Sequence, residues 1–190
     1  MDEDVATILS KPFHSPFHAY CIKPKVSFEE QVDGEEVLIQ TRPHPITQVP
    51  WLVNSLILFG LLLVSNIFTM QYLSTAQIIF GNLFGLGFIF AYVWFNFIMW
   101  YFDVGLVTNL RVVDIDFPSI LIREISATQV DKIEEATARI IGAASSIFNF
   151  GDVYVQTAGS EQNIEFLRVP YPSRIVKIIN NLTNKKKHGS

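Results

Sequence analysis

The sequence predicts a membrane-anchored α+β protein, and three observations carry this prediction. Residues 51–70 and 78–102 form two long apolar runs, no Asp, Glu, Lys or Arg lies between Arg42 and Asp103, and short alternating runs follow. At about 1.5 Å per helical residue, each apolar run spans roughly 30 Å, the thickness of the hydrocarbon core of a bilayer. We therefore expect a transmembrane helical hairpin followed by a small antiparallel β domain.

The connector and the flanking charges predict the orientation of this hairpin. Gln71–Gln77 is short and polar enough to turn at a membrane surface, which places both termini on the same side. Trp51 and Trp100 lie at the ends that then meet, where amphipathic rings settle at the interface. The turn has no Lys or Arg, whereas Arg42 and Arg111 flank the two runs. Since basic residues favour the cytoplasmic side, we expect both termini in the cytoplasm, with the hairpin in a bacterial-type inner membrane.

Small and polar residues within the runs predict contacts between helices. Gly81 and Gly85 form a GxxxG pattern, which lets helix backbones approach closely in lipid. We expect this face to pack on the chain's own first helix, and self-association of two copies is the alternative. Two helices cannot enclose a pore, so we interpret the four asparagines as hydrogen-bonding contacts between helices: Asn54, Asn66, Asn82 and Asn96.

Composition excludes several function classes. The chain carries 14 basic and 18 acidic residues, for a net charge of −4, and no region has the basic excess of a nucleic-acid-binding protein. Cys21 is the single cysteine, so no internal disulfide and no multi-cysteine zinc site can form. His14, His18 and Cys21 have a spacing that could bind a metal, but a fourth ligand is missing. We therefore expect no metal and no cofactor.

The region before the hairpin has two predicted parts. Residues 1–32 contain three separated prolines and are predicted to be irregular. Residues 33–50 contain a short strand at 37–41 and a proline-rich lead-in to the first apolar run. His44 lies in that lead-in, and we interpret it as an interfacial polar residue, because no nucleophile or second acid stands beside it.

After the hairpin, the alternating pattern predicts antiparallel strands. Asp114 and Asp116 alternate with Val113 and Ile115, which indicates a strand with one half-exposed face. Residues 138–146 are rich in small side chains and are expected to form a helical turn or a loop. The predicted strands are 103–108, 111–117, 120–126, 130–137, 151–157 and 163–169.

The last predicted element is an amphipathic helix from residue 172 or 173 to residue 182. Its apolar stripe, which must pack on a neighbouring surface, consists of Ile175, Ile178, Ile179 and Leu182. The preceding strands are the expected surface. Residues 185–190 are predicted to be a basic tail.

Several segments, taken in order, resemble the membrane-anchored bacterial pleckstrin-homology (PH)-like proteins with two transmembrane helices. The resemblance covers residues 33–183, and Pro118-Ser119 departs from it where the family often has a glycine turn. It implies that residues 103–184 form a bent antiparallel β-barrel closed by the C-terminal α-helix. The segments that carry it are Gly34–Leu38, Arg42–Pro45, Val107–Val113, Arg123–Ser126, Gln129–Ile133, Gly151–Gly159 and the helix after Val169-Pro170.

The leading function hypothesis is a non-enzymatic, membrane-anchored module that presents its barrel at the cytoplasmic face for binding or scaffolding. The partner would be a membrane-associated protein or a lipid headgroup. No GxSxG, HExxH or glycine-rich phosphate loop occurs, so we do not expect an enzyme. The alternative is an accessory subunit of a larger transport or envelope complex. The candidate headgroup contacts are Arg174, Lys177, Lys185, Lys186 and Lys187.

Overall fold

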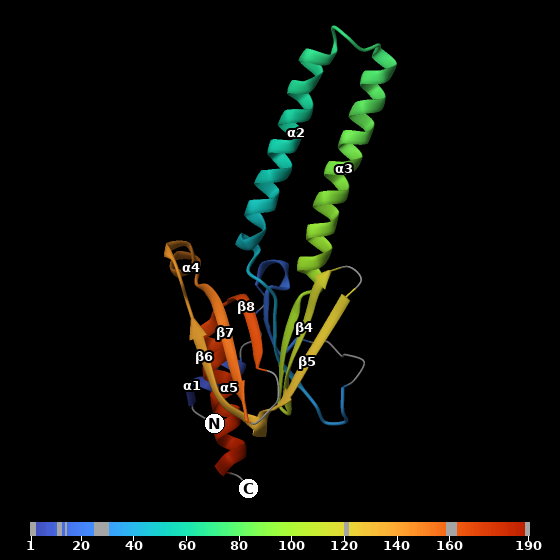
Figure 1. Cartoon of the computed structure of the whole chain (residues 1–190). Coiled ribbons are helices and arrows are strands. Elements are labelled where there is room, and N and C mark those ends of the chain that lie inside the picture. The colour runs from blue at the N-terminus through green and yellow to red at the C-terminus, as the bar shows by residue number, and fades with distance from the viewer. Residues whose placement is uncertain are drawn as a thin grey trace. The chain divides into compact units, whose positions relative to one another are not determined.

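A computed structural model describes residues 3–10, 13, 15–24, 31–119, 122–158 and 163–188 (Figure 1). The chain forms two compact units. Unit 1 joins Met1–Pro45 to Tyr101–Ser190, and unit 2 is the intervening segment Ile46–Trp100. The N-terminal segment thus belongs to the same compact unit as residues 103–184, which were predicted to form a domain.

Unit 2 is the predicted helical hairpin. After a 3-10 turn, η2 (Pro45–Gln48), come α2 (Val49–Thr69) and α3 (Thr75–Phe102). A capping box starts α3: the Ser74 N–H donates to Gln77 Oε1 at 2.9 Å, and the Gln77 N–H donates to Ser74 Oγ at 3.4 Å. Both helices are long and apolar enough to cross a membrane, and their apolar stretches are not buried within the protein.

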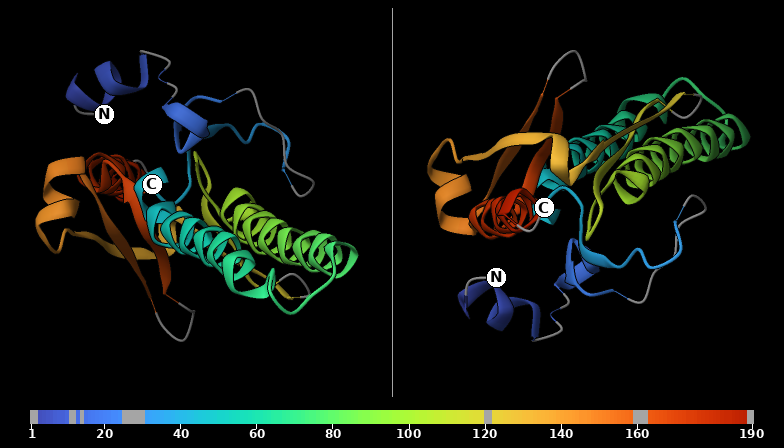
Figure 2. Two further views of the ribbon diagram at one scale, coloured as in Figure 1. Left: turned by 90° about the horizontal axis from the view of Figure 1, so that it is seen from above. Right: turned by 90° about the horizontal axis from the view of Figure 1, so that it is seen from below.

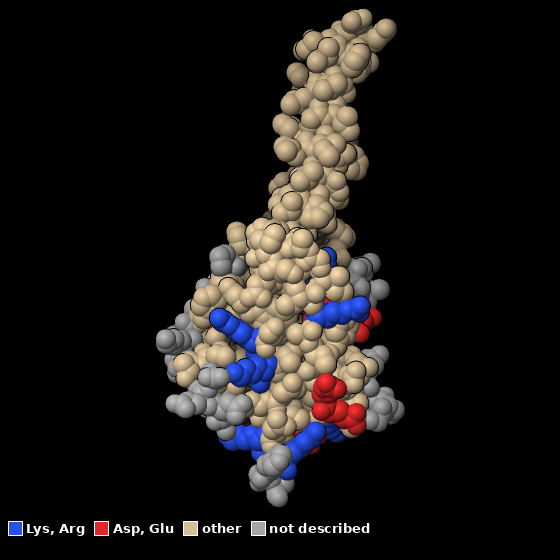
Figure 3. Space-filling view, turned by 90° about the vertical axis from the view of Figure 1, so that its left-hand side faces the viewer, with Lys and Arg blue, Asp and Glu red and all other residues tan. Residues whose placement is uncertain are grey.

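Polar and small side chains join the two helices. Asn66 and Asn82 exchange amide hydrogen bonds of 3.0 and 2.9 Å. A Cβ atom at Gly85 would lie 2.6 Å from Leu62 Cδ1, whereas Gly81 has no such neighbour within 4 Å. Figure 3 shows no charged side chain on the visible face of this hairpin, in agreement with its sequence.

Unit 1 contains a five-stranded antiparallel sheet in the order β1-β2-β3-β4-β5. Adjacent strands β2 and β3 pair through Thr41 and Gly105, so the whole hairpin is inserted between two neighbouring strands. The bounds are β1 (Tyr20–Ile22), β2 (Val37–Thr41), β3 (Val104–Thr108), β4 (Arg111–Ser119) and β5 (Ile122–Gln129).

A second, three-stranded antiparallel sheet follows in the order β6-β7-β8. A short 3-10 turn, η3 (Val130–Lys132), leads into it, so the predicted strand at 130–137 begins three residues later. The predicted turn or loop at 138–146 contains the start of α4. The bounds are β6 (Ile133–Arg139), α4 (Ala143–Phe148), β7 (Phe150–Thr157), β8 (Ile164–Pro170) and α5 (Pro172–His188).

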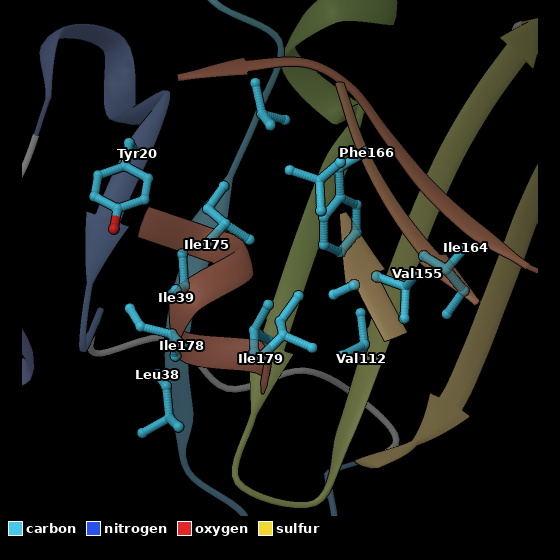
Figure 4. Close-up of a cluster of buried hydrophobic side chains, with 14 of the residues drawn as sticks. Tyr20, Leu38, Ile39, Val112, Val155, Ile164, Phe166, Ile175, Ile178 and Ile179 are labelled. Carbon is cyan, nitrogen blue, oxygen red and sulfur yellow. The ribbon is translucent and has the colours of Figure 1, made fainter. Parts of the chain in front are cut away.

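The main core lies where α5 meets the two sheets (Figure 4). Ile175, Ile178 and Ile179 are fully buried there, which confirms the predicted apolar stripe. The sheets approach closely where Phe166 of β8 covers Gly105 of β3. A Cβ atom at Gly105 would lie 2.6 Å from Phe166 Cε1, so glycine is required for this contact.

The N-terminal segment is more ordered than the sequence indicated. Residues 3–10 form a helix, α1 (Glu3–Ser10), whose Val5 and Leu9 are buried in the core. α5 lies between α1 and the three-stranded sheet (Figure 2). A short turn, η1 (Pro16–His18), then leads into β1, which pairs with β2. The separated prolines prevent one long helix but are compatible with these short elements. The prediction of an irregular segment 1–32 is therefore wrong at α1, η1 and β1.

Two further expectations need correction. In the part of the chain that the structure describes, β5 pairs with β4 and β6 pairs with β7, so the strands form two sheets and not a closed barrel. The η3 turn separates β5 from β6 and ends the first sheet. In addition, α5 continues to His188, so residues 185–188 of the predicted basic tail are helical. The coarser prediction, an α+β chain with antiparallel strands and a C-terminal helix, is confirmed.

Candidate functional site

Unit 1 has two ends, which its strand directions define. The junction end is where the chain leaves after Pro45 and returns at Tyr101. The far end holds the β3–β4 turn and η3, which lie at the opposite ends of the same strands. β6 starts next to η3 and runs back, so α4 lies at the junction end.

Arg42 is the notable cation of the junction end. It follows β2 directly and is only 8% exposed. Its guanidinium carbon lies 4.7 Å from the centroid of the Tyr101 ring, a cation–π contact. Its Nε atom is buried and has no hydrogen-bond partner among the described residues. Burial lowers the pKa of Arg42, although Tyr101 and Cys21 act in the opposite direction. Among the described residues, this guanidinium therefore lies against the tyrosine ring, and its Nε donor is left without a hydrogen-bond acceptor.

Three carboxylates also gather at the junction end. Asp103 precedes β3, and Asp114 and Asp116 lie two residues apart on β4, on the face that carries the buried Val112. Asp114 is only 6% exposed. The predicted half-exposed face is therefore found at Asp116, which is exposed, but not at Asp114. On the other face of β4, Val113 is buried in a second apolar cluster.

Burial and mutual repulsion shift the titration of this carboxylate group. Burial and the charge of Asp116 raise the pKa of Asp103 to about 7, while Arg168 opposes the shift. Burial, Asp116 and Asp103 raise the pKa of Asp114 to about 8. Burial also raises the pKa of Asp116, although its hydrogen bond with Asp114 lowers it. The group therefore shares protons near neutral pH.

His44 joins the chain exit to the region around α4. Its ring stacks on Phe150 with a centroid distance of 5.3 Å and lies 6.5 Å from Phe148. The backbone N–H of His44 donates to the Arg168 carbonyl at 2.7 Å. Burial lowers the pKa of the His44 imidazole. These contacts give His44 a packing role at the junction end.

The residues considered for a metal are only partly brought together. Cys21 Sγ lies 3.6 Å from His18 Nδ1, and Cys21 is buried. His14 lies outside the described residues. Within the described ranges, no group of three or more His, Cys, Asp or Glu side chains is positioned to hold a metal ion.

At the far end, the buried carboxylate of Glu35 is paired with Arg111. Arg111 Nε and Nη2 donate to the two carboxylate oxygens of Glu35 at 3.0 and 3.2 Å. Thr108 Oγ1 and the Val32 N–H donate to the same carboxylate at 2.8 and 3.1 Å. Burial alone would raise the pKa of Glu35, but these hydrogen bonds and the charge of Arg111 hold it below its usual value.

The predicted headgroup contacts on α5 are spread between the two ends. Arg174 lies near the start of α5, with its guanidinium 4.9 Å from the centroid of the Tyr171 ring. Lys186 Nζ lies 3.8 Å from Asp131 Oδ1 of η3, which places Lys185, Lys186 and Lys187 at the far end. Lys177 lies between them, on the same helix.

Sequence reasoning missed the two notable features of the junction end. Arg42 was treated as a topology signal and as part of a segment that carries the family resemblance, and Asp114 as a residue on a half-exposed strand face. One signal for Asp114 was present: Val112 and Val113 are consecutive, which indicates a strand covered on both faces. No signal in the sequence showed that Tyr101 would lie against Arg42.

Comparisons with known proteins add one distant likeness. No protein-family model matches the chain, and no curated protein matches it. Among solved structures, the chain is similar to the crystal structure of a DUF1696 family protein with a pleckstrin-homology domain from Shewanella loihica PV-4. The match has 15% identity and a TM-score of 0.35, and it covers 43% of this chain and 70% of that one. A likeness of this size assigns neither a family nor an activity to the chain.

Proposed function

We propose that the chain is a non-enzymatic, membrane-anchored module of the PH-like type. Unit 2 is the anchor, and unit 1 binds a lipid headgroup or a membrane-associated protein at the cytoplasmic face of a bacterial-type inner membrane. The order of strands β2 to β8 followed by α5 supports the PH-like assignment, because it is the order that the sequence resemblance implies.

One observation carries the proposal. α2 and α3 expose apolar side chains on all sides, and both ends of this hairpin join one separate compact unit. A helix that is apolar all round is either the core of a large protein or a membrane span. Since the apolar stretches of these helices are not buried in the protein, a bilayer is the environment that would cover them. Tethering then keeps unit 1 at high local concentration near lipids and membrane proteins.

Arg42 is the headgroup contact that we propose for this module. A buried Nε donor without an acceptor is costly, so an anion that reached the Arg42 guanidinium would offset that cost. Arg42 lies seven residues before the first residue of α2, and Tyr101 lies one residue before the last residue of α3. Both residues are thus within a short chain distance of the proposed spans. A lipid phosphate is an anion available at that place, and Arg binds phosphate well through its planar fork.

The second candidate function is an accessory subunit of a larger membrane complex. It is favoured by an apolar groove of about 440 Å³ along α3, lined by Leu83, Phe84, Gly87, Phe88 and Ala91. Small residues such as Gly87 and Ala91 allow another helix to approach closely in lipid. A second copy of this chain is one partner that fits such a groove.

The anchoring proposal is tested by reporter fusions to the full chain in bacterial membranes. A reporter that works only in the cytoplasm, fused after Lys187, should be active, and an export-dependent reporter inserted at Tyr72 should be active as well. The chain should also stay in the membrane pellet after alkaline extraction. Release into the supernatant contradicts the anchor, and the inverse reporter pattern contradicts the cytoplasmic orientation.

The two candidate functions are separated by crosslinking in native membranes. Identification of one protein captured reproducibly through the α3 groove supports an accessory subunit. The matched control is Leu61 on the exposed face of α2. If crosslinkers at both positions capture only lipid, the free-standing module is supported.

A further inference from the structure

The region around α4 exposes an unusual apolar surface. We define the α4 lobe as residues 140–149, which connect β6 to β7. Ile141 is 60% exposed and Ile147 is 75% exposed, and Ile140 and Phe148 are 40% and 49% exposed. Four large apolar side chains therefore point away from the core within ten consecutive residues.

The α4 lobe also lacks charge. No Asp, Glu, Lys, Arg or His occurs between Arg139 and Asp152. Some of its polar groups are satisfied within the lobe, since the N–H and the hydroxyl of Ser146 both donate to the Gly142 carbonyl at 3.1 Å. An exposed, uncharged and internally hydrogen-bonded segment can enter an apolar medium without leaving those donors unpaired.

The lobe is fixed beside the chain exit. Phe148 and Phe150 flank the His44 ring, and the Tyr171 N–H donates to the Asn149 carbonyl at 2.9 Å. His44 is followed directly by Pro45, where the apolar stretch that could span a membrane begins. At most about 3.5 Å per residue, the chain from His44 to the start of α2 cannot exceed roughly 17 Å. The polar region of each leaflet is itself about 6 Å thick.

From these observations we propose that the α4 lobe inserts into the interface of the membrane that anchors the chain, with Ile141 and Ile147 among the acyl chains. The inference rests on the proposed anchoring by unit 2. The occupant of this apolar surface is the lipid bilayer and not a protein, because the short connection keeps the lobe near lipid and no charge opposes its insertion. Together with the two helices, the lobe makes a third membrane contact, which restricts the rotation of unit 1.

The test uses single-cysteine variants of the full chain labelled with the fluorophore NBD. Cys21, the single cysteine, is buried and is replaced by Ala. The label is placed by Ile147→Cys in the lobe, by Leu61→Cys in α2, and by Glu134→Cys at an exposed position of β6. Each protein is reconstituted into phosphatidylcholine vesicles with and without bromine on the acyl chains. We expect strong quenching by brominated lipid at positions 147 and 61 and none at position 134.

The outcomes separate the inference from the anchoring proposal. Quenching at 61 without quenching at 147 overturns lobe insertion and leaves the anchor in place, and it indicates a protein partner for the lobe. Quenching at neither position overturns both proposals. Quenching at all three positions also contradicts the inference, because unit 1 would then contact lipid without selectivity. If Ile147→Cys does not fold, as judged by circular dichroism, Ile141→Cys replaces it with the same expected result.

Discussion

At the far end of unit 1, the buried Glu35 carboxylate receives two hydrogen bonds from Arg111 and two more from Thr108 and the Val32 N–H. At the junction end, Arg42 is similarly buried, but within the described part of the chain its guanidinium lies over the face of Tyr101 and its Nε has no hydrogen-bond partner. A buried charge with a full set of partners stabilises a fold or leaves it unchanged, whereas a buried charge without them lowers its stability.

The same contrast holds for the carboxylates. The charge of Glu35 is neutralised by its neighbour, whereas Asp103, Asp114 and Asp116 face one another at the junction end. At the far end, Glu35 and its partners Arg111, Thr108 and Val32 therefore form a structural clamp. At the junction end, the described residues leave Arg42 Nε without an acceptor and bring carboxylates together with raised pKa values, a pattern that also occurs at binding sites.

The largest expected effect comes from breaking the clamp. Arg111→Ala leaves Glu35 buried without its cation, and loss of one partner of a buried pair costs about 3–5 kcal/mol. Thermal and denaturant unfolding of the full chain in detergent, followed by near-ultraviolet circular dichroism, should show this loss. The control is Arg139→Ala on exposed β6, which should cost within about 0.5 kcal/mol. Equal melting of the two variants contradicts the clamp.

An intermediate effect is expected at the carboxylate group. The pKa values of Asp103 and Asp114 are raised to about 7 and about 8 from 3.8. Protonation therefore favours the folded state: its contribution is complete below about pH 4 and is lost as the pH rises through 7 to 8. Asp114→Asn removes the titrating group, so at pH 8.5 it should stabilise the chain by on the order of 2 kcal/mol.

The measurement for Asp114→Asn is a series of melts between pH 4.5 and pH 8.5. The stability difference from the parent should grow with pH and nearly vanish at the acid end. Glu134→Gln, which removes an exposed carboxylate, serves as the control and should show no such trend. A difference that is constant across the series would mean that the substitution acts by packing and not by charge.

The smallest effect on stability is expected at Arg42. In phosphate-free detergent, Arg42→Gln loses one cation–π contact but also removes an unpaired buried charge, so the net change should stay within about 1 kcal/mol. Added phosphatidylglycerol should raise the melting temperature of the parent and not that of the variant. Arg174→Gln is the matched control, since Arg174 also lies over a tyrosine ring. If phosphatidylglycerol stabilised Arg42→Gln but not Arg174→Gln, the headgroup contact would lie on α5.

Most local elements could be predicted from the sequence, because each follows from a pattern of its own. The two apolar runs, the strands after Asp103 and the stripe around Ile178 are read from spacing alone, and all occur in the structure. The division into units could not be read in this way. It depends on the pairing of β2 with β3, which joins residues on opposite sides of the hairpin, and on the pairing of β1 with β2.

The candidate site was less predictable because it arises from contacts between distant residues. Arg42 and Tyr101 meet only because β2 and α3 end side by side, and no spacing rule connects them. Asp114 was placed on a half-exposed face because its strand alternates, yet alternation cannot show which residues of the polar face a second layer covers. The exposure of Ile147 was not anticipated, since this residue lies between the turn or loop predicted at 138–146 and the strand predicted at 151–157.

The insertion of the hairpin between two paired strands sets the order of events during synthesis. β2 ends at Thr41 and its partner β3 begins at Val104, so at about 5–20 residues per second β2 waits for roughly 3–12 s. During that time Tyr20 and Ile39, which end fully buried, have no sheet to join. The contact of Asn66 with Asn82 brings the chain back toward its starting point, which reduces the entropic cost of closing this long loop. In the membrane-anchored chain that we propose, insertion of the hairpin therefore precedes assembly of the five-stranded sheet. A hairpin that failed to insert would leave β2 with an unpaired edge open to aggregation.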